Sequence, residues 1–186
     1  PAYRFDPRGA LPQSSDPQGR TLGYQVDPYG RLLSLTNENG EHFYFRWDAA
    51  NRLVREQFLD GTAREYRHDP LHNVVQVAYI PTPGNSSVEP IVHRLERDAL
   101  GRLITKTTAD GVTTYGYDEL DNLTEVHFDD AAGNSETLQL CFDALGQLVE
   151  VHSGNGVLRH RYDELGNLCR TQLFDDRWIN RMYYGS

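Results

Sequence analysis

The sequence predicts an all-β protein, a long antiparallel meander of repeated β-hairpins that curls into an open, shell-like sheet of the solenoid type. Three observations carry this prediction. A seven-residue turn phrase returns along the whole chain, a second turn signal lies near the middle of each interval between copies, and the intervening segments alternate apolar and polar residues with a period of two. No stretch sustains a helical period of three to four residues, so we expect strands between the turns.

The turn phrase consists of an aromatic residue, an aspartate, two variable residues, a glycine, a polar residue and a leucine. Residues 162–168 show it most clearly, from Tyr162 to Leu168. Its eight copies are built around Asp6, Asp27, Asp48, Asp69, Asp98, Asp118, Asp143 and Asp163. Successive aspartates lie 20 to 29 residues apart, which is the spacing of a supersecondary unit repeated along one chain.

The columns of the aligned copies predict a specific turn. Asp at the first position can bond backbone N–H groups two residues on, and Pro, which follows it in three copies, favours a type I turn. The fourth position is Gly in five copies and Asn51, His72 or Asp121 in the others, which are the residue types that best tolerate a left-handed backbone. A type I turn followed by a left-handed residue is the three-residue hairpin loop with a bulge.

Residues on either side of the turn are apolar. Five of the eight positions before Asp are aromatic, and the position five residues after Asp is always aliphatic, so these two side chains are expected to pack across the hairpin. We interpret the motif as structural and single out the following residues. They are Asp27, Gly30, Asp48, Asn51, Asp98, Gly101, Tyr117, Asp118, Asp143, Gly146, Tyr162, Asp163 and Gly166.

Further turn signals lie between the copies of the phrase. They are residues 16–19, 39–40, 60–61, 81–90, 110–111, 133–134 and 154–156, all rich in Gly, Pro, Asn and Asp. One repeat is therefore predicted to consist of a turn, a strand, a second turn at the opposite edge of the sheet and another strand. In the strand expected at 42–47, Phe43, Phe45 and Trp47 share one face. The whole chain is expected to hold about 14–16 strands.

We expect residues 1–186 to form one array of about eight copies of this repeat without an internal domain boundary. The longest interval contains an insertion near residues 80–91, which we interpret as a surface loop at the turn in the middle of the repeat. The loop is either a partner-binding element or an insertion without a function that the fold tolerates. A meander of this length has two open edges unless neighbouring chain covers them, so we expect a fragment of a larger shell.

Composition narrows the functional classes. The net charge of −9 disfavours nucleic acid and anionic membranes as partners, and no apolar run reaches the roughly 20 residues of a membrane span, so we predict no membrane insertion. Two cysteines do not make a disulfide framework, and we interpret Cys141 and Cys169 as buried free thiols on strands. A disulfide or a nucleophile is the alternative.

Few residues suggest chemistry. His127 and His152 each lie nine residues after a motif Asp and two after a glutamate, which makes them weak metal-ligand candidates. The alternative, polar residues on the solvated face of successive strands, is favoured. No triad or nucleotide-binding glycine loop is present, so we predict no catalytic residues, no cofactor and no enzyme activity.

The repeated phrase resembles the YD repeat of RHS-repeat proteins, with close matches at residues 97–103 and 162–168, and the segment 176–186 resembles part of the core of bacterial Rhs polymorphic toxins. The resemblance implies a structural segment of a hollow β-shell that encapsulates a C-terminal toxin polypeptide. It implies the rest of the shell and the enclosed toxin domain as partners, and secretion-system spike proteins through regions absent from this chain. It also implies type VI secretion in interbacterial competition, from the bacterial cytoplasm to a target cell.

An alternative remains open. Related YD-repeat proteins include insecticidal Tc-toxin subunits and animal teneurins, and the aromatic residues of this chain would also suit an adhesive or carbohydrate-binding module. A third hypothesis is an enzyme, such as a self-cleaving protease whose active residues lie outside this chain.

Overall fold

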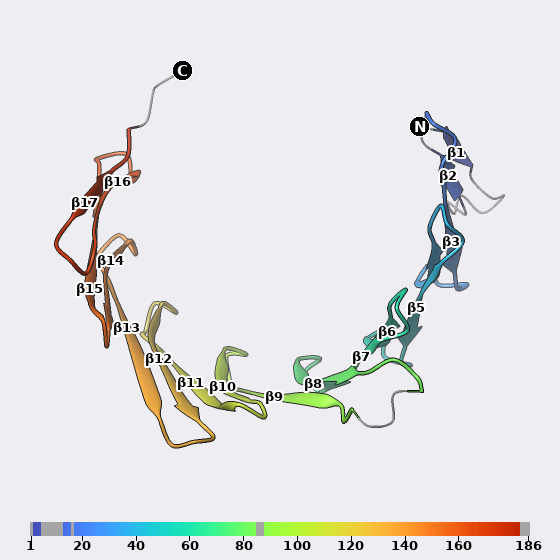
Figure 1. The fold of residues 1–186 in the computed structure, drawn as a ribbon, viewed down its shortest axis with the longest axis horizontal. Coiled ribbons are helices and arrows are strands. Elements are labelled where there is room, and N and C mark those ends of the chain that lie inside the picture. The colour runs from blue at the N-terminus through green and yellow to red at the C-terminus, as the bar shows by residue number, and fades with distance from the viewer. Residues whose placement is uncertain (1, 5–12, 16, 85–87, 183–186) are drawn as a thin grey trace. The chain divides into compact units, whose positions relative to one another are not determined.

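A computed structural model describes residues 2–4, 13–15, 17–84 and 88–182 of the chain. It divides into two compact units, residues 1–94 and 95–186. Both are built from antiparallel strands that follow chain order (Figure 1). The all-β class, the antiparallel meander and the open sheet that the sequence predicts are confirmed. A single repeat array without a boundary stays a prediction.

The first unit contains eight strands and the beginning of a ninth. They are β1 (Ala2–Arg4), β2 (Gln13–Ser15), β3 (Thr21–Val26), β4 (Leu32–Thr36), β5 (His42–Trp47), β6 (Leu53–Gln57), β7 (Ala63–His68), β8 (Val74–Ile80) and β9 (Ile91–Arg97). Each strand from β1 to β8 pairs with the next one along the chain. The unit boundary falls within β9.

The second unit continues the same pattern. Its strands are β10 (Leu103–Thr107), β11 (Gly111–Tyr117), β12 (Leu123–Asp130), β13 (Ser135–Phe142), β14 (Leu148–Ser153), β15 (Gly156–Tyr162), β16 (Leu168–Gln172) and β17 (Trp178–Asn180). Consecutive strands pair from β10 through β17. The described residues thus form 17 strands, slightly more than the sequence predicts.

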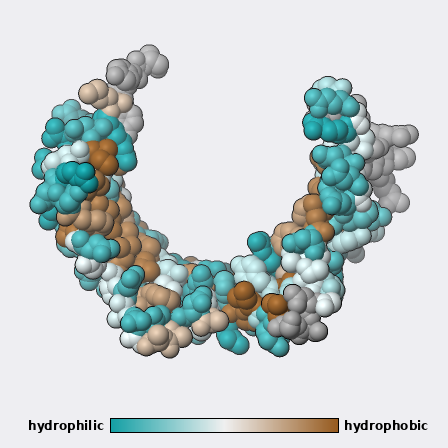
Figure 2. Space-filling model, viewed as in Figure 1, coloured by the Kyte–Doolittle hydropathy of each residue, from teal (hydrophilic) through white to brown (hydrophobic). Residues whose placement is uncertain are grey.

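The strands form because of their residue pattern. In β5 the exposed and half-buried positions alternate strictly, with Phe43, Phe45 and Trp47 on the less exposed side as predicted. The same alternation places Leu138, Leu140 and Phe142 of β13 together. In Figure 2, hydrophobic residues gather over β12, β13 and β14, with hydrophilic residues around them.

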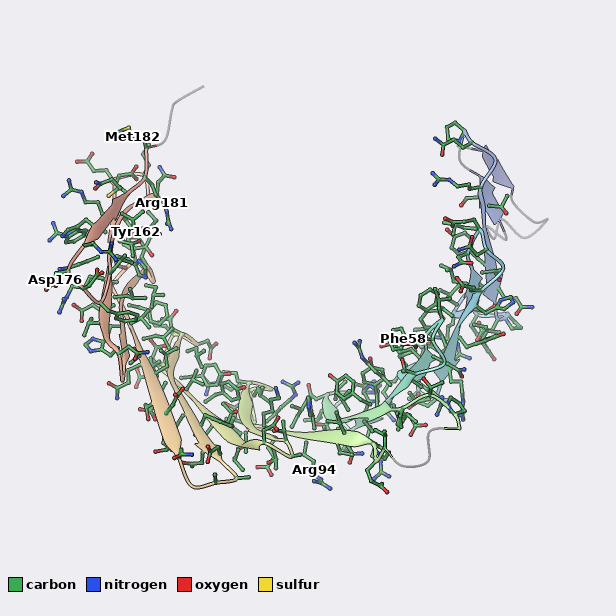
Figure 3. All side chains as sticks on the ribbon, in the orientation of Figure 1. Phe58, Arg94, Tyr162, Asp176, Arg181 and Met182 are labelled. Carbon is green, nitrogen blue, oxygen red and sulfur yellow. The ribbon has the colours of Figure 1, made fainter. Side chains whose placement is uncertain are left out.

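Each unit is a single layer, and side chains project from both of its faces (Figure 3). In the described part of the chain the buried residues are the small side chains Ala63, Ala78, Ser34 and Thr171, and no large side chain is fully buried. A conventional domain fills its centre with interdigitated apolar side chains. These sheets instead keep most apolar side chains half-exposed, as expected of a single layer that is open on both faces.

The predicted insertion is a loop between Ile80 of β8 and Ile91 of β9, of which residues 85–87 lie outside the described part. The hydroxyl of Thr82 donates a 3.0 Å hydrogen bond to the carbonyl of Asp60 in the turn between β6 and β7. Part of the loop is therefore anchored to the neighbouring turn. No helix long and apolar enough to cross a membrane occurs among the residues that the structure describes.

Candidate functional site: the repeated turn and the surfaces beside it

Seven copies of the turn phrase have a described structure, and they share one geometry. Their aspartates are Asp27, Asp48, Asp69, Asp98, Asp118, Asp143 and Asp163; the copy around Asp6 lies outside the described residues. In the second of these, the N–H of Asp48 donates to the carbonyl of Arg52 at 2.9 Å, and the N–H of Asn51 donates to the carbonyl of Asp48 at 3.2 Å. The other six copies form the same two bonds.

The motif aspartate also fixes the turn with its side chain. Oδ1 of Asp48 accepts from the N–H of Ala50 at 2.9 Å and from the N–H of Arg52 at 3.0 Å. These bonds occupy backbone donors that the loop would otherwise leave unpaired. The backbone N–H of Arg52 contributes most to lowering the pKa of Asp48, against the opposing effect of burial. At Asp163 the backbone N–H of Asn167, followed by its side-chain amide, lowers the pKa of the carboxyl in the same way.

The fourth residue of every described copy adopts a left-handed backbone, as the sequence predicts. The φ angles are 81° at Gly30, 64° at Asn51, 69° at His72, 83° at Gly101, 65° at Asp121, 76° at Gly146 and 82° at Gly166. Asn, Asp and His replace Gly at three positions because they tolerate this region better than other side chains do. The motif therefore conserves a backbone conformation and not a glycine as such.

The residues flanking the turn pair across the hairpin. The aromatic Trp47 lies opposite Leu53, and Tyr162 lies opposite Leu168, each after a bulge in the register. Tyr117 pairs with Leu123 in the same manner. The expected cross-strand pairing of the residue before Asp with the aliphatic residue after the turn is confirmed.

The aromatic residue has a second role that sequence reasoning missed. The indole N–H of Trp47 donates to the carbonyl of Leu32 at 2.8 Å, and the Tyr162 hydroxyl donates to that of Leu148 at 2.9 Å. In both cases the acceptor is the aliphatic residue that follows the turn of the preceding repeat. The Tyr117 hydroxyl makes the corresponding 2.8 Å bond to Leu103. These bonds join one hairpin to the one before it.

Arginine at the fifth position, counted from the motif aspartate, links each repeat to the next one along the chain. Nε of Arg52 binds Oδ2 of its own Asp48 at 2.7 Å, while Nη1 donates to the carbonyl of Asp69 in the next turn at 2.9 Å. Where the fifth position is Asn, as at Asn167, the side-chain amide reaches its own Asp163 at 3.1 Å. Arginine is long enough to serve both turns at once.

A row of apolar side chains lies beside these links. The third residue of six described turns is a large apolar residue, 73–88% exposed to solvent. These residues are Tyr29, Leu71, Leu100, Leu120, Leu145 and Leu165, and we call the last four, all in the second unit, the leucine row. This position is one of the two variable positions of the phrase, although leucine recurs there. Exposed apolar side chains that recur at the same position of successive turns are a candidate interaction surface.

Two of the grooves in the first unit are lined by more than one aromatic ring. One of about 380 Å³ is mainly apolar, with Phe58, Tyr79 and Ile91 in its lining. Arg64 stacks over the Phe58 ring at 5.0 Å. The other, of about 300 Å³, is lined by Tyr24, Tyr44 and polar groups that include Thr36 and His42. Their mixture of rings and hydroxyl groups is chemically suited to sugars.

The predicted metal candidates do not converge. Nδ1 of His127 lies 2.7 Å from the Thr137 hydroxyl and its Nε2 lies 3.1 Å from Asp129. His152 instead lies 2.8 Å from Glu150, on a strand separated from that of His127 by β13.

The prediction of buried thiols is wrong for Cys141, which is exposed, while Cys169 is half-buried. Neither forms a disulfide. Cys141 occupies an outward position of β13 because the strand alternates toward Leu140 and Phe142. Cysteine behaves as a small apolar residue, but this property does not determine which face of a strand it occupies.

Comparisons with known proteins agree with this geometry. The family described as RHS Repeat matches residues 97–134 and 142–175. The crystal structure of TcdB2-TccC3 without its hypervariable C-terminal region is similar with a TM-score of 0.76 and 16% identity, over 98% of this chain and 11% of that one. The crystal structure of TcdB2-TccC3 itself is similar with a TM-score of 0.73 and 17% identity, over 96% of this chain and 11% of that one.

The Photorhabdus luminescens Tc holotoxin pore is also similar, with a TM-score of 0.68 and 16% identity, over 92% of this chain and 12% of the other. At such identities the similarity shows the fold. No curated protein matches the chain. The chain spans about a tenth of the length of the solved structures that it resembles.

Proposed function

We propose that the chain, which is an RHS-repeat protein, forms a segment of the wall of a hollow β-shell that encapsulates a toxin polypeptide before delivery, and that the segment itself performs no catalysis. The observation that supports this most strongly is the single-layer sheet whose hairpins are joined by side-chain bonds at the turn edge. Such a layer needs no filled core to keep its strands in place. It can therefore separate two compartments.

The leucine row supports a larger assembly. Leu120, Leu145 and Leu165 are 75–88% exposed, and burying a leucine side chain contributes about 1.5–3 kcal/mol. We propose that this row contacts another part of the same shell. The matched chains are about nine times as long as this one, which provides the additional wall that the contact requires.

The partners follow from the same proposal. They are the remainder of the shell and an enclosed toxin-type polypeptide, as the pairing of TcdB2 with TccC3 in the similar structures suggests. Export from a bacterial cytoplasm and delivery to a target cell fit this role. The similar structures are Tc-toxin components, so spike proteins, type VI secretion and interbacterial competition stay predictions from the sequence.

Two measurements test whether the chain forms part of the wall of a shell. Small-angle scattering of the isolated chain is expected to give a cross-section about one sheet thick, near 10 Å, whereas a compact particle with a filled core would contradict the proposal. In the intact parent protein, a protease is expected to leave the enclosed polypeptide uncut while the shell is folded. Equal cleavage of that polypeptide with and without the shell would exclude encapsulation.

The groove containing Tyr24 and Tyr44 favours a second candidate, an adhesive or carbohydrate-binding module. Tyr44 is 47% exposed and its ring lies 5.6 Å from that of His42 at an angle of 31°, so two neighbouring rings are available to a ligand. Binding to a glycan array that Tyr44→Ala abolishes while the fold is retained would favour this function over the wall. Binding that persists in the variant would exclude this groove.

A further inference from the structure

Cys141, Glu150 and His152 form a cluster on one face of the second unit. Cys141 in β13 is the direct cross-strand partner of Glu150 in β14. His152 follows Glu150 by two residues, so its side chain projects from the same face. One sulfur, one oxygen and one nitrogen atom from the three side chains all lie within 4.8 Å of one another. It is the one such group of three among the residues that the structure describes.

Neighbouring side chains hold the carboxylate in place. Oε2 of Glu150 lies 2.8 Å from Nε2 of His152, and Oε1 accepts a 2.9 Å bond from Nε of Arg159. Arg159 is the partner of Glu150 on the opposite strand, β15. The guanidinium therefore occupies one carboxylate oxygen and leaves the other directed at the imidazole. A hydrogen-bonded second layer of this kind orients ligands in metal sites.

We propose that Cys141, Glu150 and His152 bind one Zn²⁺ ion. Thiolate sulfur, imidazole nitrogen and carboxylate oxygen are the donors that zinc prefers, at about 2.3, 2.0–2.1 and 2.0–2.2 Å. The thiolate and the carboxylate carry two negative charges, as many as the ion has positive ones, and Arg159 adds one positive charge beside the carboxylate. A tetrahedral ion places its donors roughly 3.3–3.8 Å apart. The nitrogen of His152 and the oxygen of Glu150, which lie 2.8 Å apart, therefore separate slightly when the ion binds.

Three protein donors leave one position for water or for a donor from another molecule. The ion would connect β13 to β14 through side chains, in addition to their backbone pairing. Cys141 is exposed, so a metal ion can reach the site from solvent. This inference does not depend on the proposed wall function.

His127 and Cys169 provide matched controls within the chain. His127 is two residues after a glutamate, as His152 is, but its ring contacts Thr137 and Asp129 instead of a thiol. Cys169 is a free thiol on β16, and its sulfur contacts the carbonyl of Arg161. Neither belongs to the cluster.

The first experiment is a calorimetric titration of the untagged, reduced 186-residue chain with Zn²⁺. We expect one equivalent to bind, and we expect Cys141→Ser and His152→Gln to abolish that step while Cys169→Ser and His127→Gln retain it. Circular dichroism verifies that each variant is folded. Unchanged binding in Cys141→Ser, or loss of binding in either control, would overturn the proposal.

The second experiment measures alkylation of both thiols in the unaltered chain by mass spectrometry, and so needs no variant. Zn²⁺ is expected to slow the reaction of Cys141 with iodoacetamide and to leave that of Cys169 unchanged. Substituting Co²⁺ is expected to produce a thiolate-to-cobalt charge-transfer absorption that Cys141→Ser lacks. Equal protection of the two cysteines, or no protection of Cys141, would contradict a site at this cluster.

Discussion

The Tyr162 hydroxyl donates a 2.9 Å hydrogen bond to the backbone carbonyl of Leu148, fourteen residues earlier in the chain. Leu148 is the aliphatic residue after the preceding turn, so the bond joins two successive repeats. Tyr162 also pairs with Leu168 across its own hairpin. One side chain therefore stabilises the hairpin to which it belongs and attaches that hairpin to the previous one.

Tyr162→Phe tests this attachment. The variant retains the ring and its packing but loses the hydroxyl donor, so we expect the free energy of unfolding to fall by about 0.5–1.5 kcal/mol. Urea denaturation measures the change. Tyr44→Phe is the control, because within the described part of the chain no hydrogen bond of the Tyr44 hydroxyl is found. An equal loss in the two variants would show that the bond to Leu148 contributes nothing specific.

The backbone requirement at the fourth turn position can be isolated with alanine. A Cβ added at Gly146 meets no atom within 4 Å, and neither does one at Gly154, but only Gly146 has a positive φ, of 76°. Gly146→Ala is expected to cost about 1–2 kcal/mol, and Gly154→Ala close to nothing. Gly116, within a strand, is a poorer control, because its Cβ would lie 3.3 Å from that of Glu125. Similar costs at 146 and 154 would refute the left-handed turn as the source of the effect.

His68 occupies the aromatic position of the phrase, and its buried Nδ1 has no hydrogen-bond partner. His68→Tyr removes this unpaired atom and places a hydroxyl where Trp47 and Tyr162 reach the preceding repeat. We expect a gain in stability of about 0.5–2 kcal/mol, measured by thermal and urea unfolding. A loss of stability would mean that this repeat is spaced differently from those containing Trp47 and Tyr162.

The motif carboxylates predict acid sensitivity. Hydrogen bonds from Asn167 lower the folded-state pKa of Asp163 below the unfolded value of about 3.9, so the unfolded state binds more protons below that pH. The stabilisation is complete above the unfolded pKa and is lost as the pH falls through the folded one. Between about pH 6 and about pH 3, Asp163→Asn is expected to lose less stability than the parent chain. The same loss in both would exclude this carboxylate as a contributor.

We expect substitutions in the leucine row to weaken assembly of the shell without changing the stability of the isolated chain. Leu120→Ser, Leu145→Ser and Leu165→Ser alter side chains that are 75–88% exposed, so each is expected to change the stability of the isolated chain by less than about 0.5 kcal/mol. Assembly of the parent shell, followed by native mass and protease resistance, is expected to weaken in the triple variant. Normal assembly would mean that the row faces solvent in the shell.

The turn could be predicted from sequence because its constraints are local. Asp48 binds backbone groups within four residues, and the left-handed position accepts only a few residue types, so the aligned copies expose both requirements. The bond from Tyr162 to Leu148 could not be predicted, because it depends on the offset between neighbouring hairpins. Nothing in a single repeat specifies that offset.

Two further turns show the limit of motif reading. Asn37 opens a turn on the opposite edge with the same bonds, its Oδ1 accepting from the N–H groups of Asn39 and Glu41. Asp176 has a φ of 63° in a turn that starts at Leu173, where no acidic residue marks the first position. That turn precedes β17, which accounts for a strand beyond the predicted number. The same backbone geometry thus occurs without the side chain that signals it.

Several bonds between repeats combine a side-chain donor with a main-chain acceptor, while Arg102 also pairs with the side chain of Asp121 in the next turn at 2.7 Å. Trp47, Tyr162 and Arg52 supply donors, and the carbonyls of Leu32, Leu148 and Asp69 receive them. Every residue type carries a carbonyl group, so a repeat places no demand on the side chains of its neighbour at these bonds. Gene duplication or recombination that inserts, deletes or exchanges a whole hairpin therefore requires no compensating substitution at these carbonyl acceptors, whereas a pair such as Arg102 with Asp121 has to be kept together.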